Sequence, residues 1–465
     1  MISTRDTNSK GRSYSDVLLE GLAEDGGLYV PNEYPRFSSE ELRRLKGISY
    51  AKLAFAIKKK LIDGAIPEHI EETLIDEAYK APTFGNESDA ITPLRTVGPN
   101  LYIQNLSLGP TASFKDMAMQ LLSREMGFEL SRRGESLTIL GATSGDTGSA
   151  AEAAFKNIPG IRLFMLSPQV GMSEFQRAQM GALSGGNICN ISIRGRFDDC
   201  QDLVKAVKQS DEFSKLGAVN SINWGRISSQ IPYYFAGYLQ AVSRIGEPVD
   251  FVVPSGNFGN VLSGYIAKQM GLPIRKCIVA TNENNVLDIL FKTGVYAVKT
   301  AHITSSPSMD ISKASNYERL VFDLFEHDAS KTRTYMETFG KTGRVDLGDF
   351  GKRPENFLQL GFESDNSSHS ERIATIQEVY ITAKTVIDPH TADGVRVALK
   401  RTRDVPTICL ETALPVKFEQ TIREALGFVP ERPPRFLNME KTASEESFIV
   451  LDPEPEALKT VLRAH

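Results

Sequence analysis

From about residue 100 onward, short runs of β-forming residues alternate with stretches of helical periodicity. The β-forming runs lie at residues 101–104, 137–140, 161–166, 249–253 and 274–280. Strands separated by helices form βαβ units, in which neighbouring strands run parallel and helices cover the sheet. The alternation therefore predicts an α/β protein with a largely parallel sheet. The chain has 465 residues, enough for about three units at roughly 150 residues per domain.

The first 95 residues have a different pattern, which predicts a helical N-terminal unit. Helices are expected from Ser39, over residues 51–61, and from Pro67 to about residue 79. Residues 340–370 are polar with patches of Gly, Asn and Ser, which favours loops. The residues after about 430 follow several prolines, and we expect them to wrap the surface or to pair at a sheet edge.

The charge balance argues against nucleic acid as a partner. Lys and Arg number 53 and Asp and Glu number 58, so the formal net charge is −5. The densest basic run, residues 58–60, follows an apolar stretch, and we expect it to be the solvated end of a helix.

The chain shows no pattern typical of a secreted or membrane protein. Its four cysteines include no C-x-x-C pair, so neither a disulfide framework nor a zinc cluster is expected. The N-terminus lacks the apolar core of a secretory signal, and no run of about 18 apolar residues occurs. We therefore expect a soluble, cytoplasmic protein without a membrane partner.

Two glycine-rich loops follow predicted strands and precede predicted helices. The first, residues 141–148, carries the hydroxyls of Thr143, Ser144 and Thr147; the second covers residues 254–260. Glycines at the start of a helix let backbone N–H groups approach an anion closely. The spacing is not that of a dinucleotide fingerprint. Two such loops suggest one ligand phosphate and one substrate anion, although ordinary strand-to-helix turns have similar composition.

Lys115 ends the run GPTASFK and stands at the start of a predicted helix. The positive end of the helix dipole disfavours an ammonium there, which favours a neutral nucleophile or an imine-forming amine. A surface lysine would give the same local pattern. The six histidines have no i, i+3 or i, i+4 pair, so we expect no metal site, and His390 is interpreted as a histidine whose hydrogen bonds are satisfied in a turn.

Seven segments occur in an order that resembles one known family. They are GPTASFKD, GATSGDTGSAA, VNSINWGRI, PSGNFGN, SSPSMDISKASNYERL, DPHTADGV and ETALPVKF. Together they resemble threonine synthase, in the longer subgroup that has an N-terminal helical domain, and residues 1–35 resemble the start of that subgroup. The likeness extends over nearly the whole chain.

The resemblance implies the fold of pyridoxal-phosphate enzymes of fold type II, the tryptophan-synthase-β-like class: two parallel-sheet α/β domains plus a helical N-terminal domain. The implied division is residues 1–95 for the helical domain, 96–135 with 250–430 for the larger cofactor-binding domain, 136–249 for the smaller domain, and 431–465 for a C-terminal tail.

The resemblance also implies pyridoxal 5′-phosphate as cofactor. Lys115 would form the Schiff base, Asp146 would lie near the 3′-oxygen, and Thr412 would meet the pyridine nitrogen. The cofactor phosphate would be held by Ser255, Gly256, Asn257, Phe258, Gly259 and Asn260.

For the substrate, the resemblance implies O-phosphohomoserine, which a phosphate-releasing lyase converts to threonine in threonine biosynthesis. Ser144 and Thr147 would bind the α-carboxylate, and Asn220, Ser221 and Arg226 would bind the phosphate. From the residues alone, a helix salt bridge is the favoured interpretation of Arg226. We expect a monomer or a homodimer.

Two departures from the family pattern keep other functions open. Leu108 stands where the family usually has His or Asn before GPT, and Ala112 and Ser113 replace the common small apolar pair. A related phospholyase or dehydratase that makes 2-oxobutyrate is therefore an alternative. A non-catalytic anion-binding regulator is a further alternative, against which the intact Lys115 argues.

Overall fold

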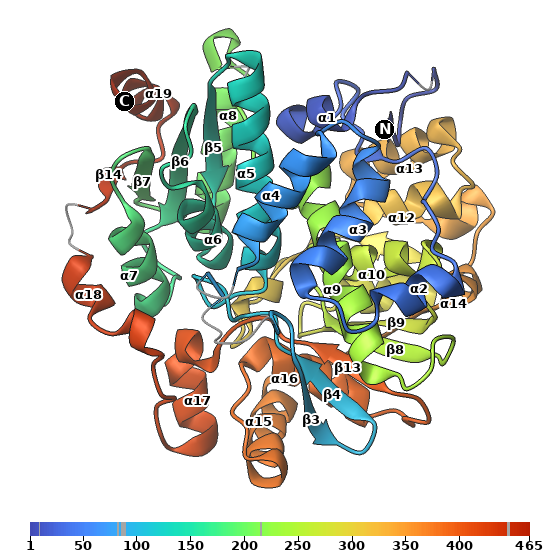
Figure 1. Ribbon diagram of the computed structural model, residues 1–465. Helices are drawn as coiled ribbons and strands as arrows, with labels where there is room; N and C mark the ends of the chain where they lie inside the picture. The colour runs from blue at the N-terminus through green and yellow to red at the C-terminus, as the bar shows by residue number, and fades with distance from the viewer. Residues whose placement is uncertain (9, 81–82, 85–89, 214–215, 444–446) are drawn as a thin grey trace.

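The computed structural model describes residues 1–465 except 9, 81–82, 85–89, 214–215 and 444–446. It contains two sheets of mainly parallel strands, as the alternation predicts (Figure 1). The larger sheet has the strand order β12 (Phe362–Asn366), β9 (Ile274–Thr281), β8 (Val249–Pro254), β13 (Thr407–Leu410), β4 (Leu101–Gln104) and β3 (Leu94–Gly98). Its only antiparallel pair among the described residues is β3 with β4.

The smaller sheet is parallel throughout its described part. Its order is β14 (Ile449–Leu451), β7 (Ile188–Ile193), β6 (Ile161–Pro168) and β5 (Leu137–Ala142). The five strands predicted from the sequence each begin at the predicted residue and end at most two residues beyond it. Strands buried on both faces have continuous apolar runs, which is why the sequence shows them clearly.

Helices cover both faces of each sheet. On the larger sheet, Phe251 and Val253 face a core shared with α9 (Trp224–Ala241), α10 (Gly259–Gln269) and α11 (Val286–Thr293). Val252, which points the other way, packs with α15 (His369–Ala383), α16 (Pro389–Leu399) and α17 (Glu419–Leu426). The smaller sheet lies between α5 (Lys115–Arg133), α6 (Asp146–Phe155) and α7 (Glu174–Leu183) on one face and α8 (Phe197–Lys208) and α19 (Pro455–Ala464) on the other.

The N-terminal region is helical, as predicted. It contains α1 (Tyr14–Glu20), α2 (Ser39–Leu45), α3 (Tyr50–Ile62) and α4 (Glu68–Ala78), with one short antiparallel pair, β1 (Ile2–Ser3) and β2 (Tyr29–Val30). Of these helices, which are blue in Figure 1, α1 and α3 lie against α9, and α1 and α4 lie against α5. Residues 295–360 form β10 (Val295–Ala297), α12 (Tyr317–Leu324), α13 (Ala329–Thr342), β11 (Arg344–Asp346) and α14 (Glu355–Leu360); α12 lies against α10, and β10 lies against α11.

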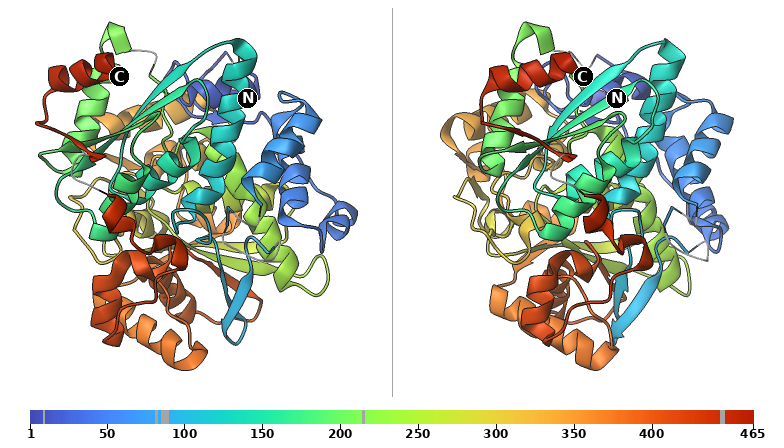
Figure 2. Two further views of the ribbon diagram at one scale, coloured as in Figure 1. Left: turned by 60° about the vertical axis from the view of Figure 1, so that its left-hand side comes forward. Right: turned by 90° about the vertical axis from the view of Figure 1, so that its left-hand side faces the viewer.

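The end of the chain returns to the smaller sheet, which confirms the prediction of edge pairing. β14 pairs in parallel with β7, Ile449 opposite Ile191, after the short helix α18 (Met439–Thr442). Figure 2 shows α19, in red, beside the green helix α8. No helix in the described part of the chain combines the length and the apolar character needed to cross a bilayer.

Two expectations are wrong. Residues 340–370 are not mainly loops: they contain β11, α14 and β12, and β12 forms an edge of the larger sheet by pairing with β9. At an edge only one side needs a partner, so a short polar strand suffices. Lys58 is not solvated either, because α3 packs on α9 and places Lys58 Nζ 2.8 Å from Glu125 Oε1, with both side chains fully buried.

Candidate active site

Lys115 is the first residue of α5, and its segment is fixed to the chain that follows β13. The Phe114 N–H donates to the Thr412 carbonyl at 2.9 Å, and Ser113 forms an isolated bridge with Ala413. Ala112 has φ +58°, in the left-handed region, which turns the chain sharply into the helix. The Lys115 side chain is 15% exposed, and its Nζ lies 3.7 Å from Asp146 Oδ2.

Burial lowers the pKa of Lys115 to about 8; the nearby Asp146 carboxylate acts to raise it, while the Arg226 and Lys417 charges lower it further. A lysine with such a pKa is about one-tenth neutral at pH 7, far more than an ordinary lysine, and nucleophilic and base chemistry require the neutral amine. The prediction of a disfavoured ammonium is thus confirmed in direction, but burial, rather than the helix dipole, is the largest cause.

Asp146 lies at the start of α6, in the first glycine-rich loop, and holds several partners at once. Its Oδ1 lies 2.7 Å from Lys417 Nζ and accepts from Gln176 Nε2 at 3.0 Å, while its Oδ2 accepts from Ser308 Oγ at 2.8 Å. Burial acts to raise the pKa of Asp146, but the Lys417 and Lys115 charges outweigh it and hold the pKa well below its ordinary value. Asp146 is therefore a buried carboxylate beside Lys115.

The first glycine-rich loop uses one of its three hydroxyls internally. Thr143 Oγ1 accepts from the N–H groups of Gly145 and Gly148 at 3.0 and 2.8 Å. Ser144 is exposed and Thr147 half-buried, and neither hydroxyl bonds to another residue in the described part of the chain. Of the three, Ser144 and Thr147 are the ones left for a ligand.

The second glycine-rich loop joins β8 to α10 and has one unsatisfied hydroxyl. Ser255 Oγ is buried without a hydrogen-bond partner among the described residues. Phe258, at φ +67°, packs among aromatic rings, and Asn260 Oδ1 accepts from the hydroxyls of Tyr233 and Tyr234 at 2.6 and 2.9 Å. The side chains of Phe258 and Asn260 thus serve the core, which leaves the hydroxyl of Ser255 and backbone N–H groups of this loop to meet an anion.

Arg226, in the first turn of α9, is 4% exposed and incompletely paired. Its Nη1 donates to the Val219 carbonyl at 3.0 Å, whereas its Nε is buried without a partner in the described ranges. No described acidic residue pairs with it, so the helix salt bridge is not observed. Burial lowers the pKa of Arg226 to about 10. The two other predicted phosphate ligands, Asn220 and Ser221, precede α9; Asn220 is exposed and Ser221 half-buried.

Asn316 and Arg319 connect the predicted cofactor and substrate segments, and sequence reasoning assigned neither a role. Asn316 Nδ2 donates to the Ser221 carbonyl at 3.0 Å, and its backbone N–H donates to the Asn257 carbonyl at 3.2 Å. Arg319 is fully buried and donates to the carbonyls of Ile222 and Tyr29 at 2.6 and 2.9 Å. Their only sequence signal was their place in the segment SSPSMDISKASNYERL.

His390 and Thr412 lie near the same group. His390 Nδ1 lies 2.7 Å from Asp388 Oδ1, and its Nε2 accepts from the Ser308 N–H at 3.0 Å, so the prediction of a satisfied histidine is confirmed. Thr412 is 5% exposed and its backbone N–H donates to Thr391 Oγ1 at 3.0 Å. Its hydroxyl makes no hydrogen bond within the described residues, which leaves it free for a ligand. Leu108 is half-buried against the main apolar core.

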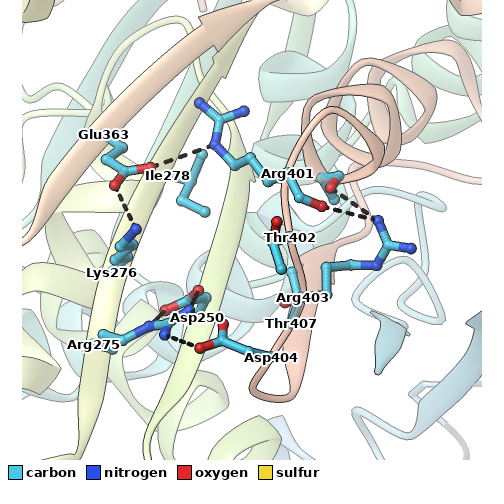
Figure 3. A pocket seen from close by; sticks show the side chains of 11 residues that line it. Asp250, Arg275, Lys276, Ile278, Glu363, Arg401, Thr402, Arg403, Asp404 and Thr407 are labelled. Carbon is cyan, nitrogen blue, oxygen red and sulfur yellow. Dashed lines mark hydrogen bonds and ion pairs between the residues drawn. The ribbon is translucent and has the colours of Figure 1, made fainter. Parts of the chain in front are cut away.

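A hollow lined by charged side chains lies at the end of the larger sheet that is opposite to Lys115 (Figure 3). It has a volume of about 400 Å³ and is lined by residues at the amino ends of the strands, among them Asp250, Arg275, Glu363 and Thr407. Lys115, Ser255 and Thr412 belong to the carboxyl end of the same sheet. In open parallel sheets ligands bind at the carboxyl ends of the strands, which makes the Lys115 end the candidate active site.

Three family models match the chain in succession. They are described as "Threonine synthase N terminus" for residues 1–79, "Pyridoxal-phosphate dependent enzyme" for residues 86–338 and "Threonine synthase, C-terminal" for residues 391–462. The chain is 48% identical to a threonine synthase of Methylobacillus glycogenes over 477 aligned positions, covering 100% of this chain and 99% of that protein. It is also 48% identical to the threonine synthase of Corynebacterium glutamicum, covering 94% of this chain and 92% of that protein.

Solved structures with a similar fold include a threonine synthase. The crystal structure of a PLP-bound threonine synthase from Brucella melitensis superposes with a TM-score of 0.93 at 40% identity, covering 100% of this chain and 98% of that one. A tomato threonine deaminase superposes with a TM-score of 0.51 at 14% identity, covering 87% of this chain and 98% of that one; at this identity the likeness shows the shared fold alone.

Proposed function

The chain belongs to the threonine synthase family and is a pyridoxal-phosphate-dependent lyase, and we propose that its substrate is O-phospho-L-homoserine, which it converts with water to L-threonine and phosphate. The incomplete pairing of the buried Arg226 guanidinium is the observation that supports this substrate most strongly. A buried guanidinium with a free Nε beside Lys115 is a costly arrangement unless an anion completes it. A substrate phosphate would do so.

The residues at the carboxyl end of the larger sheet fit pyridoxal phosphate. The unpaired hydroxyl of Ser255, with the N–H groups of Gly256, Asn257, Gly259 and the start of α10, suits the cofactor phosphate. The amine of Lys115, with its lowered pKa, is suited to attack the aldehyde carbon of the cofactor. A neutral hydroxyl such as that of Thr412 beside the pyridine nitrogen does not force that nitrogen to be protonated.

Asp146 would lie near the cofactor's 3′-oxygen, next to Lys115, with its own charge balanced by Lys417 Nζ at 2.7 Å. Phe258 and Asn260 would contribute through their backbone rather than through their side chains, since those are engaged in the core. The cofactor, when bound, supplies an electron sink that stabilises negative charge on the substrate carbons.

The chain's own groups then divide the work of the reaction. Ser144 and Thr147 hold the α-carboxylate at the start of α6, and Arg226 with Asn220 and Ser221 holds the phosphate. Lys115 Nζ removes a proton from Cα and then from Cβ, and its pKa of about 8 suits a base that must also release protons. Phosphate leaves from Cγ with its charge balanced by Arg226, the two protons return to Cγ and Cα, and water adds its hydroxyl to Cβ and its remaining proton to the released phosphate.

Asn316 supports both binding segments from one position. It bonds the backbone of Ser221 and of Asn257, so the predicted phosphate sites of substrate and cofactor are held at a set separation. Catalysis depends on such placement, because an error of about 1 Å in the position of a reacting group costs about a hundredfold in rate.

Product analysis tests this proposal. With O-phospho-L-homoserine, the holoenzyme should release threonine and inorganic phosphate in equal amounts, both measurable by mass spectrometry and a phosphate assay. Predominant 2-oxobutyrate would contradict the proposed reaction and favour the phospholyase alternative. The Leu108→Asn variant tests whether the leucine at the position where the family usually has His or Asn affects the product. If Leu108 serves only packing, the ratio of threonine to 2-oxobutyrate should not change.

A further inference from the structure

Lys417 is a fully buried lysine that has no role in the proposed reaction. It lies in the 3₁₀ turn Pro415–Phe418, five residues after Thr412. Its side chain is 0% exposed, and its Nζ lies 2.7 Å from Asp146 Oδ1. The ammonium also donates to the Thr111 carbonyl at 2.9 Å and to Gln179 Oε1 at 3.3 Å. Each of the three N–H groups of its ammonium therefore has an acceptor.

The partners of Asp146 leave Lys115 in an unusual position. Oδ1 is bonded by Lys417 and Gln176, and Oδ2 is bonded by Ser308. Lys115 Nζ lies 3.7 Å from Oδ2, a full ångström farther than Lys417 Nζ lies from Oδ1. The carboxylate is thus neutralised mainly by Lys417, and Lys115 is its neighbour rather than its main partner.

We propose that Lys417 is a positioning residue for Lys115: by holding the charge of Asp146, it prevents that carboxylate from locking Lys115 into a tight ion pair and so keeps the Lys115 amine free to react. This inference rests on the proposed role of Lys115. It assigns to Lys417 a function through Asp146, without contact to cofactor or substrate.

The charges around Lys115 determine the sign of the effect. Asp146 on α6 attracts a proton to it, while Arg226 on α9 and Lys417 in the 3₁₀ turn repel one. Asp116, the next residue on α5, is occupied by the N–H and the hydroxyl of Thr111, and the Asp388–His390 pair reaches the group through the Ser308 N–H.

Removal of Lys417 takes away a repelling charge and releases the Asp146 carboxylate to Lys115. Both changes favour the ammonium form of Lys115, so its pKa rises and it reacts only at higher pH. Removal of the Asp146 charge does the reverse. The two single variants should therefore shift Lys115 in opposite directions, and the double variant should lie between them.

Competitive acylation of the apoenzyme measures this without turnover. The protein is labelled with trace acetic anhydride between pH 6 and 11, and peptide mass spectrometry gives the pH at which Lys115 is half reactive. We expect this midpoint to rise by about one pH unit or more in Lys417→Met and to fall in Asp146→Asn. Asp146→Asn/Lys417→Met should be near wild type, and Lys417→Arg should retain the wild-type midpoint.

Lys59→Met is the matched control, because Lys59 forms a 2.8 Å ion pair with Glu68 in which both side chains are at least half exposed. It should leave the Lys115 midpoint unchanged. Equal midpoints in wild type, Lys417→Met and Asp146→Asn would overturn the proposal and leave Lys417 a structural residue. If Lys417→Met does not fold, an unchanged midpoint in Asp146→Asn overturns it alone. Failure of the proposed reaction would instead appear in the products, with the midpoints still shifted.

Discussion

Charged side chains cluster at both ends of the larger sheet, but the two clusters differ in burial and in pairing. At the amino end, Arg275 pairs with Asp250 and Asp404, and Glu363 pairs with Lys276 and Arg401, in a hollow open to solvent (Figure 3). At the carboxyl end, Lys115, Asp146, Arg226 and Lys417 are largely buried, and Arg226 Nε and Ser255 Oγ have no partner in the described part of the chain.

This difference separates a surface network from a binding site. Exposed ion pairs form between neighbours at little gain and little cost, because water solvates whatever is unpaired. A buried group without a partner is destabilising, so each one needs an explanation, and unpaired groups that lie in the same site as Lys115 and Asp146 favour a ligand there. The abundance of charge therefore says less about function than burial with incomplete pairing does.

The largest effect is expected from Lys115→Ala. It removes the only predicted covalent attachment and the proposed base, so turnover and the visible absorbance of the bound cofactor should both be lost. Lys59→Ala, a solvated lysine on α3, is the control and should retain both. If Lys115→Ala retained the absorbance and the turnover, Lys115 would be as dispensable as a surface lysine, and the carboxyl end of the sheet would not be the active site.

Arg226→Met should have the next largest effect. Loss of a buried charge-assisted contact costs about 2–5 kcal/mol, which is roughly 30- to 5,000-fold in kcat/KM for the phosphorylated substrate. Binding of an unphosphorylated amino acid, followed by the cofactor spectrum, should change little. Equal losses with both ligands would indicate that Arg226 is structural.

Asn316→Ala should have a moderate effect, because it removes the side-chain bonds to the carbonyls of Ser221 and Asn257 and the bond that Asn316 Oδ1 accepts from Arg319, while the backbone bond to Asn257 stays. At about 1–1.5 kcal/mol for each bond, KM for the phosphorylated substrate should rise by at least roughly 5- to 10-fold. Asn356→Ala on α14 is the control. A weaker cofactor affinity with unchanged KM would show that Asn316 supports the cofactor loop instead.

Lys276→Met, at the amino end, should have the smallest effect. Its pair with Glu363 is partly exposed, so the free energy of unfolding should fall by about 0.2–1 kcal/mol, and kcat/KM should not change. Denaturant unfolding and steady-state kinetics check both. A drop in kcat/KM comparable to that of Arg226→Met would show that both ends of the sheet serve the reaction.

The sequence predicts what depends on neighbouring residues and misses what depends on distant ones. The strands at residues 101–104 and 274–280 were visible as apolar runs, whereas the polar strand β12 was not predicted, and neither were β3, β7 and β13. Lys58 and Lys417 look like ordinary lysines because their carboxylate partners, Glu125 and Asp146, lie far away in the chain. The roles of the site residues and the division into domains stay predictions.

The most direct test of the central claim is the location of the cofactor. Holoenzyme is reduced with borohydride, digested, and the modified peptide is identified by mass spectrometry. We expect the cofactor to be attached to Lys115, the partly paired lysine at the carboxyl end of the larger sheet, and its neighbour Lys417 to be unmodified. Attachment to Lys417, or to any other lysine, would rule out the proposed role of Lys115.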